Sequence, residues 1–126
     1  SQVMALEWNG LESFIHPTDS PLFSSGVDLP QVTASRQLAY QKIVGEKPTQ
    51  RSLLAFHRQH HSEESHKSVC MHREDAETVS FTHIIVTHKE QEMRYVAGSP
   101  CIKLTMEALL QGAHKLPNRN AVALPV

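Results

Sequence analysis

The chain has 126 residues, of which 40% are hydrophobic and 20% charged, and a formal net charge of −1. This length allows one domain with its own core over residues 1–126, and the near-neutral charge gives no electrostatic basis for binding nucleic acid or an anionic membrane. No apolar run is long enough to span a bilayer, and the first residues lack the basic and apolar regions of a signal peptide. Two cysteines do not make a disulfide framework, so a reducing, cytoplasmic environment is expected.

Two alternating runs at the start of the chain predict a β-hairpin. Residues 3–8 and 11–15 flank Asn9-Gly10, and an Asn-Gly pair between alternating runs favours a tight turn because both turn positions need a positive φ. Leu22-Phe23 is a candidate for a short third strand. Residues 24–30 are expected to be irregular and exposed.

Three helices are predicted from capping residues and apolar spacing. Ser35, Thr49 and Thr105 have the side chains that cap helix N-termini, and Gly45 is a suitable stop for the first helix. The helices are expected over residues 35–44, 50–60 and 106–114. Their inward residues are expected to be Leu38, Ala39 and Ile43, then Leu53, Leu54 and Phe56 or His57, then Met106, Leu109, Leu110 and Ala113.

The stretch 68–101 predicts three more strands, because β-branched residues alternate at period two. They are expected over residues 68–72, 78–87 and 92–97, and the last two should pair antiparallel across a charged turn. Bulky apolar residues lie on both faces of the run 78–87, which favours a position inside a layered sheet. The chain must then leave the sheet, because Pro100 cannot donate to a strand ladder.

The order of these elements predicts the fold class. Runs of strands separated by a pair of helices indicate an α+β fold with a mainly antiparallel sheet and helices covering one side. Residues 117–126, which contain two prolines, are expected to form a loose tail.

Three segments, in this order, resemble the closing part of the acyl-coenzyme A:6-aminopenicillanic-acid acyltransferase family, a branch of the N-terminal-nucleophile hydrolases. They are Ser68-Val69-Cys70-Met71-His72, Thr78-Val79-Ser80 and Gly98-Ser99-Pro100-Cys101. The runs 3–8, 11–19 and 36–61 resemble the strand, its hairpin partner and the helical pair that precede them in the family. The resemblance covers residues 3–101.

The resemblance implies a four-layer αββα sandwich, here a partial one, and an enzyme that cleaves or transfers an amide-linked acyl group. The family nucleophile is an N-terminal cysteine exposed by self-cleavage, with its own α-amino group as the base. Because this sequence begins at Ser1 and its cysteines are internal, the resemblance predicts the C-terminal region of such a protein, inactive alone. The expected partner is an N-terminal catalytic segment or a second copy. The alternative is a non-catalytic binding or assembly module, favoured if only an initiator Met precedes Ser1 in the gene.

One catalytic position carries over from the family in altered form. The family has an oxyanion-binding asparagine where this chain reads Phe23-Ser24-Ser25-Gly26, and Ser25 takes the place of the asparagine. A hydroxyl can donate a hydrogen bond, but it is shorter than an amide side chain and reaches a different point.

Nine histidines in this length suggest a metal site as a second hypothesis. The histidine cluster is His57, His60, His61, His66 and His72, with Cys70 close by. His57 and His61 would share a helix face, and Cys70 and His72 would share a strand face, so these four residues could form a Cys/His₃ zinc site. The spacing is irregular and contains no CxxC or HExxH motif. The sequence therefore favours a solvated helix end and a buried strand cysteine, with no cofactor and no tightly bound zinc.

A thiol–imidazole pair is a third hypothesis. Cys70 could be activated by His72 or His83, whereas Cys101 lies in a turn and should be the more exposed thiol. A structural role for both cysteines is favoured, because catalytic thiols are rarely found in the middle of a strand.

Overall fold

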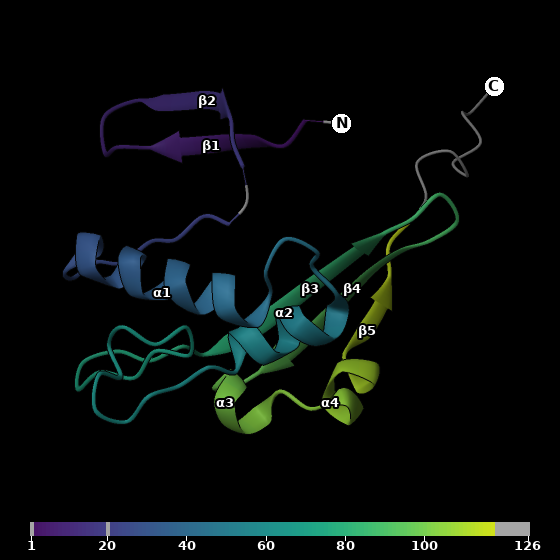
Figure 1. Ribbon diagram of the computed structural model, residues 1–126. Helices are drawn as coiled ribbons and strands as arrows, with labels where there is room; N and C mark the ends of the chain where they lie inside the picture. Colours follow the sequence, from purple (N-terminus) through teal and green to yellow (C-terminus); the bar gives the residue numbers. More distant parts are fainter. Residues whose placement is uncertain (1, 20, 118–126) are drawn as a thin grey trace.

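A computed structural model of the chain describes residues 2–19 and 21–117 (Figure 1). The elements are β1 (Met4–Trp8), β2 (Ser13–Pro17), α1 (Leu29–Ile43), α2 (Gln50–His57), β3 (Ser80–Val86), β4 (Gln91–Ala97), α3 (Pro100–Lys103), α4 (Met106–Gln111) and β5 (Ala113–Lys115). They form one two-stranded and one three-stranded antiparallel sheet, so the predicted α+β class is confirmed. No helix among these residues is both long and apolar enough to cross a bilayer. The predicted loose tail, apart from Pro117, lies outside the described residues.

The predicted N-terminal hairpin is confirmed, with a longer turn than the Asn-Gly pair suggests. β1 and β2 pair so that Leu6 faces Ile15, and β2 begins at Ser13. Within the turn, residues 9–12, only Gly10 has a positive φ, of 98°, and the Asn9 side chain accepts hydrogen bonds from the N–H groups of Leu11 and Glu12. Hydrogen bonds to the Asn9 side chain therefore stabilise this turn, whereas a two-residue turn would need a second residue with positive φ.

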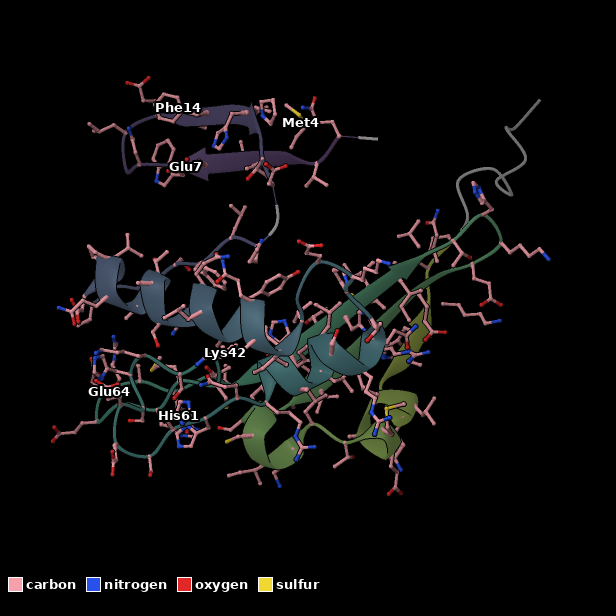
Figure 2. The ribbon with its side chains drawn as sticks, viewed as in Figure 1. Met4, Glu7, Phe14, Lys42, His61 and Glu64 are labelled. Carbon is pink, nitrogen blue, oxygen red and sulfur yellow. The ribbon has the colours of Figure 1, made fainter. Side chains whose placement is uncertain are left out.

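The β1–β2 hairpin exposes nearly all of its apolar side chains. Figure 1 shows it apart from the three-stranded sheet, and Figure 2 shows Met4 and Phe14 on it. The exposed residues are Val3, Met4, Leu6, Trp8, Leu11, Phe14 and Ile15. A two-stranded hairpin is marginally stable when nothing covers it, so this apolar surface is a conspicuous feature of the chain.

Helix α1 begins six residues before the predicted start. Pro30 lies in its first turn, where the missing N–H costs nothing, and Asp28 precedes it with a φ of 53°. Ser35 is therefore inside the helix, and the fully buried side chain is Val32, whereas Leu38 is exposed. The predicted stop is confirmed, because Gly45 adopts a φ of 68° just after the helix. The candidate strand Leu22-Phe23 does not form.

The Arg36 side chain of α1 links the segment between β2 and α1 to the loop that follows α2. The Arg36 guanidinium donates to the carbonyl of Ser24 through Nη1 (3.0 Å) and to that of Ser68 through Nε (3.1 Å).

Helix α2 begins where the sequence predicts and ends earlier. Thr49 and Ser52 form a capping box, each side chain accepting from the other's backbone N–H at 3.0 Å. The helix ends at His57 instead of residue 60. Buried Phe56 packs edge-on against Tyr40 with ring centroids 5.2 Å apart, which joins α2 to α1.

The predicted antiparallel pairing of the run 78–87 with 92–97 is confirmed as β3 and β4, with Phe81 opposite Val96. These two residues form the core with Leu104 and Leu109. The expected burial of both faces is wrong, because Ile84 on the other face is 57% exposed. Val79 belongs to the predicted strand 78–87 but lies just before β3, and it is 66% exposed.

After β4 the chain leaves the sheet, as predicted, and makes two short helices. Thr105 caps α4 by accepting from the N–H of Ala108 at 3.1 Å. The helix ends at Gln111 because Gly112 lies against β4, where its carbonyl accepts from the N–H of Tyr95 at 3.0 Å. Residues 113–115 then form β5 on β4, so Ala113 is not in a helix. Of the four predicted inward residues only Leu109 is buried; Met106 and Leu110 are exposed.

Candidate functional site

The loop that follows α2 carries most of the candidate residues, and its predicted strand over 68–72 does not form. Its one ladder bridge joins His72 to Glu77. The N–H of Cys70 instead donates to the carbonyl of Gln59 at 2.9 Å. The N–H of Val69 donates to the side-chain oxygen of Gln59, also at 2.9 Å. Local hydrogen bonds thus satisfy a backbone that has no neighbouring strand, and they hold Cys70 in place.

Three sequence segments that are apart in the chain meet at this loop. The N–H of Cys101 donates to the Cys70 sulfur at 3.3 Å, and the Ser99 hydroxyl donates to the Thr78 carbonyl at 3.1 Å. Two further bonds join the same segments: Thr78 N–H to Met71 O at 2.8 Å, and Gly98 N–H to Val79 O at 2.7 Å. Residues 68–72, 78–80 and 98–101 therefore form one structural unit.

Two thiols and two imidazoles gather in this unit. We call His60, Cys70, His72 and Cys101 the Cys/His cluster. His72 Nε2 lies 3.3 Å from Cys101 Sγ and 3.6 Å from Cys70 Sγ. The rings of His60 and His72 meet edge to face with centroids 4.6 Å apart, and the ligand atoms of His60, His72 and Cys101 all lie within 4.8 Å of one another.

Both imidazoles have an oxygen at the Nδ1 side of the ring. His60 Nδ1 lies 3.0 Å from the Cys70 carbonyl oxygen, and His72 Nδ1 lies 3.5 Å from Oε2 of Glu77. The Ser99 hydroxyl lies 3.5 Å from the same Glu77 oxygen. These contacts orient the two rings so that the Nε2 of His72 points at the sulfurs.

The two thiols differ in their surroundings. Cys70 is fully buried, whereas Cys101 is partly exposed. Burial raises the pKa of the Cys70 thiol to about 11; the N–H of Cys101 lowers it in part, while the Cys101 thiol and Glu77 raise it. Cys70 alone is thus a neutral thiol and a poor nucleophile at neutral pH, and Cys101 is the accessible sulfur.

This geometry can support two kinds of chemistry. Cys101, His72 and Glu77 stand in the order of a nucleophile, a base and an orienting carboxylate. Two sulfurs and two imidazoles are also the donor set that binds soft or borderline metal ions such as zinc.

The structure separates the histidines that the sequence grouped together. Because α2 ends at His57, His57 and His61 do not share a helix face. His57 packs between the rings of Phe56 and Phe81, with centroids 5.3 and 5.0 Å away, and burial lowers its pKa. His66 Nε2 lies 4.0 Å from an Asp28 oxygen. Of the predicted group, only His60, Cys70 and His72 belong to the Cys/His cluster.

The other predicted positions lie elsewhere. Ser25 donates to the carbonyl of Val27 at 2.6 Å and accepts from its N–H at 3.2 Å, within the connection from the hairpin to α1. His83, considered as a base for Cys70, lies on β3 beside Phe81.

Sequence reasoning did not assign Cys101 and Glu77 to a site. The sequence did contain an indication for Cys101. Gly-Ser-Pro before it predicts a turn at which the chain leaves the sheet, and a side chain at such a turn can contact neighbouring segments. For Glu77 the sequence showed only that it lies in an acidic turn. Its place beside the imidazole depends on the isolated β-bridge between His72 and Glu77, which only the structure shows.

A hollow of about 580 Å³ lies between α2 and the α3–α4 segment and shares no residue with the Cys/His cluster. Its lining combines apolar residues such as Leu54 and Leu109 with Arg51 and Arg58. A ligand with an apolar body and an acidic group fits that lining chemically.

Compared with models of known protein families, with curated proteins and with solved structures, the chain gives no significant match.

Proposed function

We propose that this chain is the C-terminal region of an amide hydrolase or acyltransferase of the N-terminal-nucleophile type, and that it contributes structure instead of the nucleophile. The observation that carries the proposal is the meeting of the segments 68–72, 78–80 and 98–101. These are the segments with the family resemblance, and hydrogen bonds such as Cys101 N–H to Cys70 Sγ join them. The three short matches therefore belong to one packed unit instead of three unrelated places in the fold.

The chemistry of the two cysteines supports a non-nucleophilic role. The family mechanism uses the α-amino group of the nucleophilic cysteine as its base. Cys70 and Cys101 are internal and carry no free α-amino group, and Cys70 is also buried as a neutral thiol. The position of the oxyanion-binding asparagine is Ser25, whose hydroxyl is engaged with Val27. We therefore expect no turnover from the isolated chain.

The exposed apolar surfaces support a larger assembly. In an αββα sandwich, the faces of both sheets are covered by another layer. Here Leu6 and Trp8 on the hairpin and Ile84 and Val86 on β3 are exposed. A catalytic segment that supplies the missing layer would bury them.

The first test uses the gene. If an in-frame segment precedes Ser1, the complete reading frame should be expressed and its products measured by intact mass and N-terminal sequencing. We expect self-cleavage before a cysteine and release of acid from penicillin-type amides or of coenzyme A from acyl thioesters. Alanine at that cysteine should abolish both, and His88→Ala, in the exposed β3–β4 turn, should leave both unchanged. A reading frame with only an initiator Met before Ser1 contradicts the proposal.

The second test uses the isolated chain with the same substrates. No acid or coenzyme release is expected above the rate of buffer. Turnover that disappears in Cys101→Ala would contradict the proposal, because it would mean that Cys101 with His72 performs the chemistry.

A non-catalytic assembly module is the second candidate, and the exposed hairpin favours it. Apolar surface of this kind is typical of protein–protein contacts. If the chain is such a module, sedimentation should show a dimer or larger oligomer, and Leu6→Glu with Ile15→Glu should return it to monomer. The matched control is Glu7→Gln with Glu12→Gln on the same hairpin.

A further inference from the structure

We propose that the Cys/His cluster binds one Zn²⁺ through Cys70, Cys101, His72 and His60, as a structural site that fastens the loop after α2 to helix α3. The inference does not rest on the proposed function, because it uses only the positions of these four side chains and their neighbours.

Two of the donor distances match those of a tetrahedral zinc ion. With bonds of about 2.0 Å to nitrogen and about 2.3 Å to sulfur, the N–S edge of a tetrahedron is about 3.5 Å. The two N–S distances at His72 Nε2 are 3.3 Å to Cys101 and 3.6 Å to Cys70. His60, His72 and Cys101 each place one ligand atom within 4.8 Å of the other two. Cys70 is outside that group of three, although its sulfur lies 3.6 Å from His72 Nε2, so its sulfur would have to shift toward the other donors when the ion binds.

The second contacts of both histidines are those of zinc ligands. A ligating imidazole normally donates its other N–H to a carbonyl or a carboxylate, which fixes the tautomer. His60 has the Cys70 carbonyl at Nδ1, and His72 has Glu77 at Nδ1. A proton on Nδ1 in each ring would leave Nε2 free to bind the metal, and in His72 Nε2 faces the two sulfurs.

The donor set selects the ion and the type of site. Two thiolates and two imidazoles in a tetrahedron favour zinc over the hard cations, which prefer oxygen. Four protein ligands close the coordination sphere, so the site is structural instead of catalytic. Zinc binding also accounts for why a fully buried thiol lies beside a second thiol and an imidazole, since the metal takes the place of the two thiol protons.

A catalytic triad explains fewer of these contacts. Cys101, His72 and Glu77 would suffice for it, and it gives no role to Cys70 at 3.6 Å from the same nitrogen or to His60 against His72. The sequence favoured no zinc because it contains no CxxC or HExxH motif. The zinc hypothesis combined a helix pair, His57 and His61, with a strand pair, Cys70 and His72, whereas the cluster takes His60 and Cys101 in place of His57 and His61.

The site would supply stability that the core does not. Among residues 2–19 and 21–117, the buried core cluster holds Phe81, Val96, Leu104 and Leu109. The loop after α2 contributes none of them, and small domains with little core commonly use a metal ion.

The test begins with the metal content of the full chain, purified without an affinity tag or chelator. We expect about one equivalent of zinc by mass spectrometry. Cys101→Ala and His72→Ala should lose it, while His88→Ala and His114→Ala, at exposed positions outside the cluster, should keep it. Glu77→Gln should weaken zinc binding by about 10–100-fold, and its control Glu74→Gln in the same turn should not. Zinc retained by Cys101→Ala overturns the assignment.

Cobalt binding by the wild-type chain tests the proposed metal site even if a variant of the Cys/His cluster fails to fold. After zinc is removed, added Co²⁺ should give the sulfur-to-metal charge-transfer band and the strong visible bands of a tetrahedral thiolate site. Zinc well below one equivalent together with no charge-transfer band overturns the proposal. The proposal is also overturned if protein purified in reducing buffer contains a Cys70–Cys101 disulfide and binds neither zinc nor cobalt.

Discussion

The backbone N–H of Cys101, at the start of α3, donates a hydrogen bond to the sulfur of Cys70 over 3.3 Å. This bond crosses 31 positions of sequence and joins the loop after α2 to the end of the three-stranded sheet. It fixes the Cys70 sulfur in the interior while the Cys101 sulfur stays within reach of solvent.

Alkylation should therefore distinguish the two cysteines. With chelator present, iodoacetamide at mildly alkaline pH should modify Cys101 many times faster than Cys70, because Cys70 is buried and its pKa is raised to about 11. Peptide mapping at successive times measures both rates. In the metal-free chain, with chelator still present, the unfolded state loses its Cys70 proton above the ordinary thiol pKa of 9.0, before the folded state does, so stability should fall from there up to about pH 11. Cys70→Ser should flatten this fall; equal alkylation rates would contradict the prediction.

Phe81→Ala should lower the free energy of unfolding by about 3–5 kcal/mol, as for other buried aromatic residues. Phe81 is 6% exposed and packs with Val96, Leu104 and Leu109. Val79→Ala is the matched control two positions away, since Val79 is 66% exposed, and it should change stability little. Urea unfolding of the three proteins measures the difference. Similar losses in both variants would show that the core is elsewhere.

Gly112→Ala should destabilise the chain through a collision with β4. A Cβ at this position would lie 2.0 Å from the carbonyl oxygen of Tyr95, which belongs to a backbone and cannot turn away. Overpacking of this kind costs about 1–3 kcal/mol. Gly26→Ala is the control, because nothing lies within 4 Å of its Cβ and its φ is not positive. Thermal unfolding should show a clear drop in Tm only for Gly112→Ala, and an unchanged Tm in that variant would refute the close approach.

Acid should destabilise the chain partly through His57. Burial, and then the charge of His83, lower the pKa of His57 in the folded state. The unfolded chain takes up the proton near the ordinary value of 6.5, so the stability from this group is present above that pH and is lost as the pH falls below it.

His57→Phe keeps a ring between Phe56 and Phe81 and removes the titration. Measured by urea unfolding between about pH 7.5 and pH 5, its stability should fall less steeply than that of the wild type, by up to about 1.4 kcal/mol per pH unit. His88→Gln in the exposed turn should follow the wild type. Parallel curves for His57→Phe and the wild type would rule out this role.

The parts of the fold that could be predicted are those with a local cause. The capping side chains of Thr49 and Thr105, and the alternation in β3 and β4, each act within a few residues. The start of α1 was missed because Pro30 was taken for a loop residue, although proline suits a first helical turn. Strand β5 was missed because only its contact with β4 makes it a strand.

The candidate site was harder, because it is a tertiary feature. Cys70 and His72 were singled out as neighbours on a strand, and they are close together although no strand forms. The sequence does not indicate the course of the loop 58–79, because hydrogen bonds from Val69 and Cys70 to Gln59, outside the segment 68–72, determine it. Without that path, nothing indicates that His60 and Cys101 arrive at the same point.

One guanidinium joins the connection that follows the exposed hairpin to the loop that carries Cys70 and His72. The planar fork of Arg36 holds the carbonyls of Ser24 and Ser68 at once, and a lysine, with one point charge, cannot grip both in fixed directions. Ser68 is two residues from Cys70. Arg36 therefore fixes the connection between the hairpin and α1 to the same loop that carries Cys70 and His72, and one side chain opposes a displacement of either segment.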